Sequence, residues 1–123
     1  LPAKALPADC SRSYKVNDGD TCDIISAKES VSTYQLALVN KGVIDSGCDN
    51  LFVGEVICLG IIGQDCTTVH TVKNGNTCDA IEEWAGIDFA TLLANNKNIN
   101  NQCSNLRSGE VLCTASSVIP YSG

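Results

Sequence analysis

One twelve-residue segment occurs twice in this chain, and both copies carry a cysteine at the same place. The first, Tyr14–Ile25, reads Tyr-Lys-Val-Asn-Asp-Gly-Asp-Thr-Cys-Asp-Ile-Ile, and the second, His70–Ile81, reads His-Thr-Val-Lys-Asn-Gly-Asn-Thr-Cys-Asp-Ala-Ile. Each copy opens with a strand-like alternation, passes an Asp-Gly or Asn-Gly turn and reaches Thr-Cys where a helical pattern begins. A repeated unit of this kind is a unit of structure, so we expect two similar modules.

The cysteines fit the same division into two modules. They form two sets of four with nearly equal spacing: Cys10, Cys22, Cys48 and Cys58, then Cys66, Cys78, Cys103 and Cys113. Modules of about 50 residues bury little surface and usually need covalent staples, so two disulfides per module and an oxidising compartment are expected. Zinc is the competing interpretation, but structural zinc sites favour closely spaced cysteine pairs with nearby histidine, and this chain lacks that pattern.

The residue pattern predicts the same four elements in each module, which is an α+β fold. In the first module these are a strand around Tyr14 and Val16, helices around Ile25 and Leu36, and a strand over Glu55–Leu59; in the second they are a strand over Val69–Val72, helices around Ile81 and Leu92, and a strand over Glu110–Cys113. Asp20 or Thr21 is the expected N-cap of the first helix. The two strands of each module can pair as an antiparallel sheet with both helices on one face.

The strand model also bears on module boundaries and on cysteine pairing. We expect a disordered leader over 1–9, module one over 10–59, a linker over 60–65, module two over 66–114 and a patternless tail over 115–123. Ile61 and Ile62 in the linker are candidates to pack the modules together. Four cysteines per module allow three pairings. Of these, antiparallel strands place Cys10 nearest Cys58 and Cys22 nearest Cys48.

Charge and composition narrow the classes of partner. The net charge of −6 argues against nucleic acid and anionic membranes, because both require a basic face. No apolar run approaches the length of a membrane span. The chain begins Leu-Pro-Ala-Lys rather than with Met, and we expect a mature secreted protein without a cofactor.

Both modules resemble a known family. The order Tyr-x-Val-x-x-Gly-Asp-Thr-Cys-x-x-Ile, a helix ending in Asn, an Ile, and Asn-Leu-x-x-Gly-x-x-x-Cys is similar to a LysM domain, and the four-cysteine form resembles the secreted fungal version. The likeness covers Tyr14–Leu59 and His70–Thr114. It implies a strand–helix–helix–strand fold and binding of N-acetylglucosamine polymers, usually chitin. In secreted fungal proteins it further implies an effector that hides or shields chitin, in the cell wall or the host apoplast.

The resemblance also implies a ligand groove in each module, between the loop after the first strand and the loop after the second helix. The positions carried over are Gly19, Asp20, Thr21, Asp23, Asn40, Lys41, Ile44 and Asp45 in module one, and Gly75, Asn76, Thr77, Asp79, Asn96, Lys97, Ile99 and Asn100 in module two. Glycine-containing loops bring backbone polar groups close to a sugar, and Ile44 or Ile99 can form an apolar shelf for the acetyl methyl group. The competing interpretation is that Asp20 and Thr21 only cap a helix.

Three aromatic and aliphatic residues stand outside the motif. Trp84 could stack on a sugar, but its mid-helix position, three residues after Ile81, favours a core or semi-core residue. Tyr34 and Leu38 share one helical face, which could be a protein contact.

Two other functional classes compete with a carbohydrate-binding protein. A small hydrolase of the same polymer needs two carboxylates across a cleft, and Asp20, Asp23, Asp45 and Glu55 are available in module one. Module two keeps only some of these acids, so catalysis is not expected. A disulfide-rich inhibitor or toxin fits the composition but leaves the loop motifs unexplained.

The short linker bears on how two shallow sites reach useful affinity. One groove alone should bind weakly. Both modules could engage one long chain, close on one oligomer, or clamp an oligomer between two protein copies. A linker of six residues rarely allows two modules to fold face to face, so we expect ligand-induced self-association.

Overall fold

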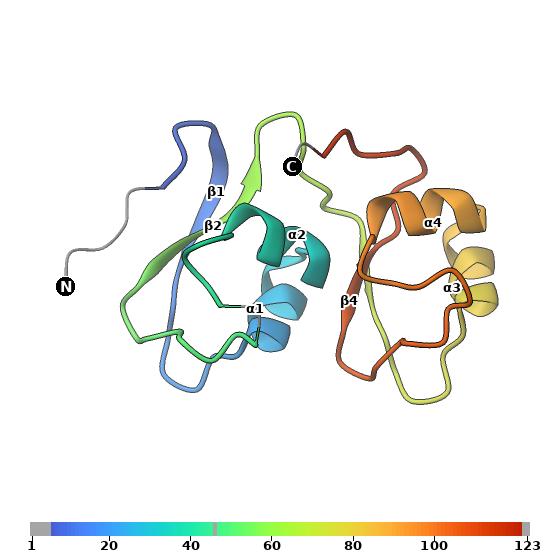
Figure 1. The fold of residues 1–123 in the computed structure, drawn as a ribbon, viewed down its shortest axis with the longest axis horizontal. Coiled ribbons are helices and arrows are strands. Elements are labelled where there is room, and N and C mark those ends of the chain that lie inside the picture. Colours follow the sequence, from blue (N-terminus) through green and yellow to red (C-terminus); the bar gives the residue numbers. More distant parts are fainter. Residues whose placement is uncertain (1–5, 46, 122–123) are drawn as a thin grey trace.

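The computed structural model describes residues 6–45 and 47–121 and shows two modules side by side (Figure 1). Module one contains strand β1 (Cys10–Lys15), helices α1 (Cys22–Glu29) and α2 (Thr33–Val39), and strand β2 (Val56–Ile61); module two repeats the order with β3 (Val69–Thr71), α3 (Cys78–Ala85), α4 (Phe89–Asn95) and β4 (Val111–Cys113). The predicted α+β class and element order are confirmed. Residues 1–5 of the expected leader and 122–123 of the expected tail lie outside the described residues.

Each module has one two-stranded antiparallel sheet. Cys10 of β1 lies opposite Ile61 of β2, and Val69 of β3 lies opposite Cys113 of β4. Strand β2 therefore continues through Gly60 and Ile61, so the first two residues of the expected linker belong to the sheet. Two strands alone are marginally stable, and the helices and disulfides supply the remaining stabilisation.

Short polar side chains cap the N-termini of the four helices that the structure describes. Thr21 caps α1 and Thr77 caps α3, each accepting a hydrogen bond from the backbone N–H three residues later. Thr21, rather than Asp20, is therefore the cap of the first helix. Helices α1 and α3 end at residues in the left-handed conformation, Ser30 and Gly86. None of the described helices has the length and apolar character needed to cross a membrane.

Each module buries its own small core between its sheet and helices. The core residues are Val16, Ile25, Val31, Leu36, Ile57 and Leu59 in module one, and Val72, Cys78, Ile81, Leu92, Ile99 and Leu112 in module two. Trp84 does not join them, although it follows Ile81 of the core by three residues on α3. Trp84 is 63% exposed and lies against the ring of His70 at the surface, so its expected core or semi-core position was wrong.

The disulfides repeat one pairing in both modules. Cys10–Cys58 and Cys66–Cys113 join the beginning of each module to its last strand. Cys22–Cys48 and Cys78–Cys103 join the start of the first helix to the loop before the last strand. The pairing that antiparallel strands favoured is confirmed, and all eight cysteines are used.

The modules dock through the helices of module one and the β4 end of module two. Val111 N–H donates to Thr33 Oγ1 at 2.9 Å, and buried Gln35 accepts from Cys66 N–H and Tyr121 O–H through its Oε1. The tail therefore returns to α2, and burial raises the pKa of Tyr121 to about 12. Ile62 does not serve as packing between modules, because it is 69% exposed.

Candidate functional site

Module two has an open groove between the loop joining β3 to α3 and the loop joining α4 to β4. Its volume is about 640 Å³, and the residues lining it are Asn76, Thr77, Cys78, Asp79, Phe89, Asn101, Gln102, Cys103, Ser104 and Leu106. The Cys78–Cys103 disulfide joins the two walls. Amide and hydroxyl side chains thus share one hollow with an aromatic ring and a leucine, a combination suited to a small polar ligand with an apolar part.

The first wall of the groove is the loop that joins β3 to α3, and it is held by a turn that the sequence repeat encodes. Gly75 has a φ of +86°, a conformation that favours glycine. Asn76 Oδ1 then accepts hydrogen bonds from Lys73 N–H at 2.8 Å and from the His70 ring at 3.0 Å. Thr77 Oγ1 caps α3 by accepting from Ala80 N–H. The wall is therefore fixed before any ligand arrives.

The second wall of the groove is the loop that joins α4 to β4, and asparagine side chains stabilise it. Asn100 Oδ1 accepts from Ser104 N–H at 2.9 Å, its Nδ2 donates to Ser104 Oγ at 2.7 Å, and its own N–H donates to Asn105 Oδ1 at 3.0 Å. Asn98 Nδ2 donates to Glu110 Oε2 at 2.8 Å, and burial raises the pKa of that Glu110 carboxyl. Asn100 therefore positions Ser104, which lines the groove.

The candidate residues of module two divide between the groove and its support. Asn76, Thr77 and Asp79 line the groove, and their contact with a ligand stays a prediction. Ile99 is only 5% exposed and belongs to the core, so it does not offer the predicted shelf. Gly75 and Lys97 are exposed and lie outside the groove lining.

Asn96 has a structural role that sequence reasoning did not separate from ligand binding. Its side chain is fully buried, with Nδ2 donating to Leu92 O and Cys113 O and Oδ1 accepting from Cys113 N–H. Asn40 makes the same three bonds in module one, to Leu36 and Cys58. Since each side chain already bonds the main chain through both of its polar atoms, these two residues hold the last strand against the second helix.

Several groove residues were missed by the sequence reasoning: Phe89, Asn101, Gln102, Ser104 and Leu106. The Cys78–Cys103 pairing was the available signal. A disulfide that joins these two cysteines must bring the residues beside Cys103 to the wall that begins at Asn76.

Module one has a smaller hollow at the corresponding place, and an arginine from module two borders it. The hollow measures about 140 Å³, and Arg107 is part of its lining together with Cys22, Thr33, Leu36, Ala37, Ile44, Asp45, Gly47 and Cys48. The Arg107 guanidinium makes two hydrogen bonds to Asp23, at 2.6 and 3.0 Å, and this contact raises the pKa of Arg107. Asp23 corresponds to Asp79, so the ion pair occupies a position that is open in module two.

The first wall of module one is also committed to internal contacts. The Asp20 carboxylate accepts from the Tyr14 hydroxyl, from Asn17 N–H at 2.8 Å and from Lys28 Nζ at 3.3 Å. Its pKa is lowered, chiefly by the Tyr14 hydrogen bond. Gly19, with a φ of +86°, forms the preceding turn.

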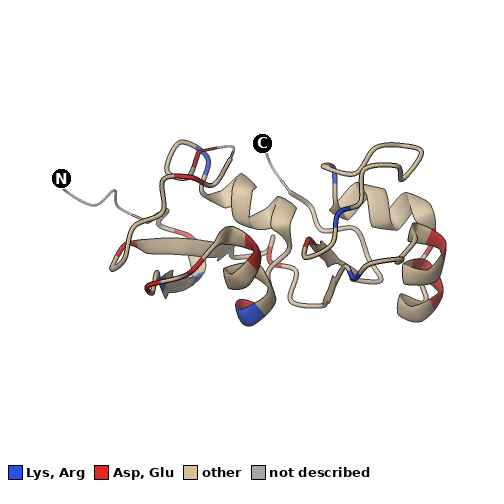
Figure 2. Ribbon diagram, turned by 90° about the horizontal axis from the view of Figure 1, so that it is seen from below, with Lys and Arg blue, Asp and Glu red and all other residues tan. Residues whose placement is uncertain are grey.

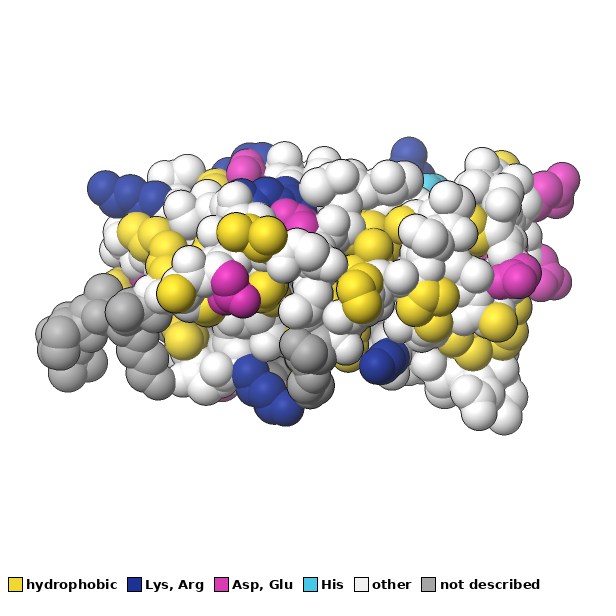
Figure 3. Space-filling view, turned by 90° about the horizontal axis from the view of Figure 1, so that it is seen from above, with side chains coloured by type: hydrophobic (Ala, Val, Ile, Leu, Met, Phe, Trp, Pro, Cys, Tyr) yellow, Lys and Arg dark blue, Asp and Glu magenta, His cyan; other side chains and the backbone are white. Residues whose placement is uncertain are grey.

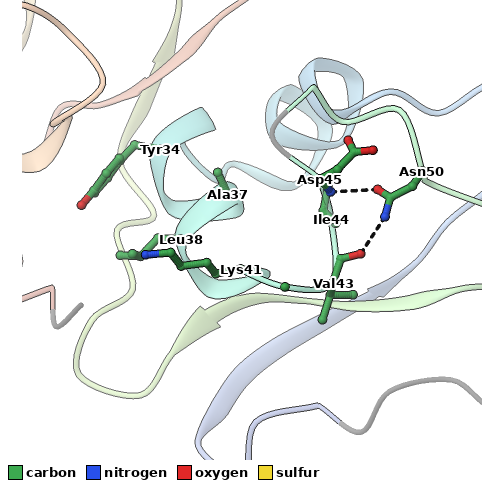
Figure 4. Close-up of a pocket in the computed structure, with 9 residues that line it drawn as sticks. Tyr34, Ala37, Leu38, Lys41, Val43, Ile44, Asp45 and Asn50 are labelled. Atoms are coloured by element: carbon green, nitrogen blue, oxygen red, sulfur yellow. Dashed lines mark hydrogen bonds between the residues drawn. The ribbon is translucent and has the colours of Figure 1, made fainter.

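A second hollow of about 640 Å³ lies beside α2 and shares Ala37, Ile44 and Asp45 with the first one. Residues of α2 and of the loop that follows this helix line it (Figure 4). Asn50 holds that loop by accepting from Asp45 N–H at 2.9 Å and donating to Val43 O at 3.0 Å. The candidate residues Lys41, Ile44 and Asp45 line this hollow. The candidate site of module one is therefore divided, because Asp20 and Thr21 are absent from its lining.

Charges are spread over both modules rather than gathered in one basic face. Acidic residues occur along α3 at the outer end of module two, and lysines and arginines are interspersed elsewhere (Figure 2). Seen from above, hydrophobic side chains reach the surface at several separate places (Figure 3). Among the described residues no group of three His, Cys, Asp or Glu side chains is suited to a metal ion.

Two strand–helix–helix–strand modules with corresponding loop grooves define a tandem-repeat domain protein. The family is shown by a match to the LysM domain model over residues 14–60 and 70–114, which is most of the chain. This chain belongs to the LysM domain family, as its sequence motifs indicated.

Several LysM effectors of fungi are similar to this chain. It is 28% identical to the secreted LysM effector LysM1 of Trichophyton rubrum, over 88% of this chain and 52% of that protein. It is 32% identical to the non-secreted LysM effector LCP1 of Gibberella moniliformis, over 91% of this chain and 15% of that protein. It is 27% identical to a secreted LysM effector of Pochonia chlamydosporia, over 88% of this chain and 33% of that protein. The chain spans about half or less of the length of these curated relatives.

Proposed function

We propose that this LysM protein binds polymers of N-acetylglucosamine, above all chitin and its oligomers. The groove of module two carries the proposal, because Asn76, Asn101 and Gln102 line the same hollow as Phe89 and Leu106. An N-acetyl sugar presents an amide, hydroxyl groups and one methyl group. Side-chain amides both donate and accept hydrogen bonds, and the apolar pair can receive the methyl group.

The proposal assigns binding without catalysis. Glycoside hydrolysis ordinarily uses two carboxylates that face each other across the scissile bond. Asp79 is the one carboxylate among the described residues that line the open groove. Of the acids considered for module one, Asp20 and Asp23 are held in ion pairs and Glu55 is buried. Asp45 braces its own loop by accepting a hydrogen bond from a main-chain N–H.

Calorimetry with fully acetylated and deacetylated oligomers tests this function. We expect clear binding of the acetylated form and weaker binding of the deacetylated form, because each lost acetyl group removes a contact worth about 1–3 kcal/mol. The protein is acidic and attracts cationic chitosan, so the comparison is made over a series of salt concentrations. Equal affinities at high salt would contradict recognition of the acetyl group.

The two grooves should not be equivalent, since Arg107 borders only that of module one and pairs there with Asp23. In Arg107→Ala we expect the calorimetric stoichiometry for a short oligomer to rise from one to two per chain. The fold should tolerate the change, because an exposed ion pair contributes roughly 0–1 kcal/mol. A double variant that exchanges the charges, Asp23→Arg with Arg107→Asp, restores the ion pair and should return the stoichiometry to one. An unchanged stoichiometry in Arg107→Ala would show that the ion pair does not close this groove.

We further propose that long chitin chains recruit more than one protein copy, outside the cell, and that the covered polymer is shielded from enzymes and receptors. The small size of a single groove supports recruitment, since one such site binds few sugar units. Similarity to relatives named secreted LysM effectors supports the extracellular setting. Sedimentation of the protein with short and long oligomers measures recruitment directly, and a larger complex is expected only with the long ones.

A further inference from the structure

Helix α3 carries an exposed tryptophan beside a second hollow of module two. The hollow measures about 360 Å³ and lies between β3 and α3, with Thr68, His70, Ile81, Trp84 and Thr114 in its lining. It shares no lining residue with the groove described above. Helix α3 lies at the end of module two that faces away from module one (Figure 1).

The hollow combines an aromatic face with polar groups. Trp84 is 63% exposed, and its ring lies 5.4 Å from that of His70, centroid to centroid, at an angle of 47°. The hydroxyls of Thr68 and Thr114 lie in the same lining, with Thr114 Oγ1 directed to Thr68 O at 3.3 Å. An exposed indole with hydroxyl groups and an imidazole nearby is suited to a pyranose ring, which has apolar C–H faces and a polar rim.

The hydrogen bonds around His70 determine which nitrogen of its ring donates a hydrogen bond and which one accepts. Asn76 Oδ1 accepts from Lys73 N–H at 2.8 Å, so the atom that faces His70 Nε2 at 3.0 Å is the carboxamide oxygen. Because that oxygen only accepts, Nε2 must donate, which leaves Nδ1 as the acceptor of the neutral ring. Asn76 also lines the groove, so this bond links the groove wall to the tryptophan hollow.

Module one carries different side chains at the positions that correspond to this hollow. Arg12 stands at the position of Thr68, and its guanidinium donates to Glu29 O and to Ser30 O, at the end of α1. Lys28 stands at the position of Trp84 and places its Nζ 5.0 Å from the centre of the Tyr14 ring. Two long cationic side chains with contacts inside module one therefore stand at the positions where Thr68 and Trp84 border the hollow of module two.

We propose that the hollow beside Trp84 is a second saccharide site, in which the indole stacks on one pyranose ring of a β-linked N-acetylglucosamine chain. His70 Nδ1 accepts a hydrogen bond from a sugar hydroxyl, and Thr68 donates or accepts through its own. The site rests on the proposed function, since it takes another unit of the same polymer. Long chains and insoluble chitin use it, whereas a short oligomer in the groove does not require it.

Tryptophan fluorescence and calorimetry test the site together, because Trp84 is the only tryptophan in the chain. Long oligomers should shift or quench its emission over the same concentration range that produces heat. Trp84→Ala should bind long oligomers about fivefold to tenfold more weakly than the unmodified protein, and its affinity for short oligomers should be unchanged. Trp84→Phe should retain part of the affinity for long oligomers that Trp84→Ala loses. Lys28→Ala, the matched change in module one, should bind like the unmodified protein.

The possible outcomes separate this site from the proposed function. Heat of binding without any change in emission, or an unchanged affinity of Trp84→Ala for long oligomers, would overturn the second site and leave the groove standing. An absence of heat from the unmodified protein with every oligomer would overturn the proposed function, and the second site with it. Circular dichroism of Trp84→Ala should match the unmodified protein, since an exposed side chain is removed.

Discussion

Replacing Cys78 and Cys103 together by serine should unfold module two and abolish binding of chitin oligomers. This disulfide joins the start of α3 to the loop that supplies Asn101 and Gln102, so it holds the two walls of the groove at a fixed separation. Removing a native disulfide from so small a module costs about 2–5 kcal/mol, which is comparable with its whole stability. Urea unfolding followed by circular dichroism measures the loss of stability, and calorimetry measures the loss of binding.

The matched change in module one provides the control. Cys22→Ser with Cys48→Ser removes the equivalent disulfide from the module whose hollow is small and bordered by Arg107. We expect a similar loss of stability, with binding by module two retained. Chemical reduction of all four disulfides should unfold both modules. A Cys78 and Cys103 variant that kept its affinity would show that the walls do not depend on this bond.

The elements of each module were predictable because they depend on residues close in sequence. The Gly-x-Thr-Cys segment forms a turn and a cap within a few residues, and Thr21 and Thr77 take the same role in both copies. The disulfide pairing followed from one further step, the antiparallel pairing of the strands. Local sequence patterns and the antiparallel pairing of the strands were therefore sufficient to predict the elements and the disulfides.

Docking of the modules could not be predicted, because it joins residues that no repeat relates. Arg107 is 84 residues from Asp23, and Tyr121 is 86 residues from Gln35. Neither contact belongs to a local pattern, and neither has a counterpart at the equivalent position of the other module. The contact of Arg107 with Asp23, beside the hollow of module one, is thus a property of the pair of modules.

The candidate site was predicted by position but not by the direction of its side chains. The resemblance placed Asn40 and Asn96 in the groove, whereas both point inward and bond the main chain. Similarly, Ile99 lies next to the loop and belongs to the core. A sequence motif does not distinguish a residue that touches a ligand from one that supports the loop, because both roles restrict which amino acid can occupy the position.

A pair of asparagines in module two can separate these two roles by experiment. Asn96→Ala removes three hydrogen bonds and leaves Leu92 O, Cys113 O and Cys113 N–H buried without that partner. Each such group costs about 1–3 kcal/mol, so the total should reach about 3 kcal/mol or more. Urea unfolding should therefore show a large loss of stability, and the affinity should fall because module two is partly unfolded.

Asn101→Ala should have the opposite profile. Asn101 is exposed and lines the groove, so its loss should change stability by less than about 0.5 kcal/mol while lowering the affinity for chitin oligomers about fivefold to tenfold. Asn40→Ala in module one should lose as much stability as Asn96→Ala, because it removes the same three bonds. An Asn96→Ala protein with unchanged stability and reduced affinity would return Asn96 to the ligand, and an Asn101→Ala protein with full affinity would move the ligand away from this wall.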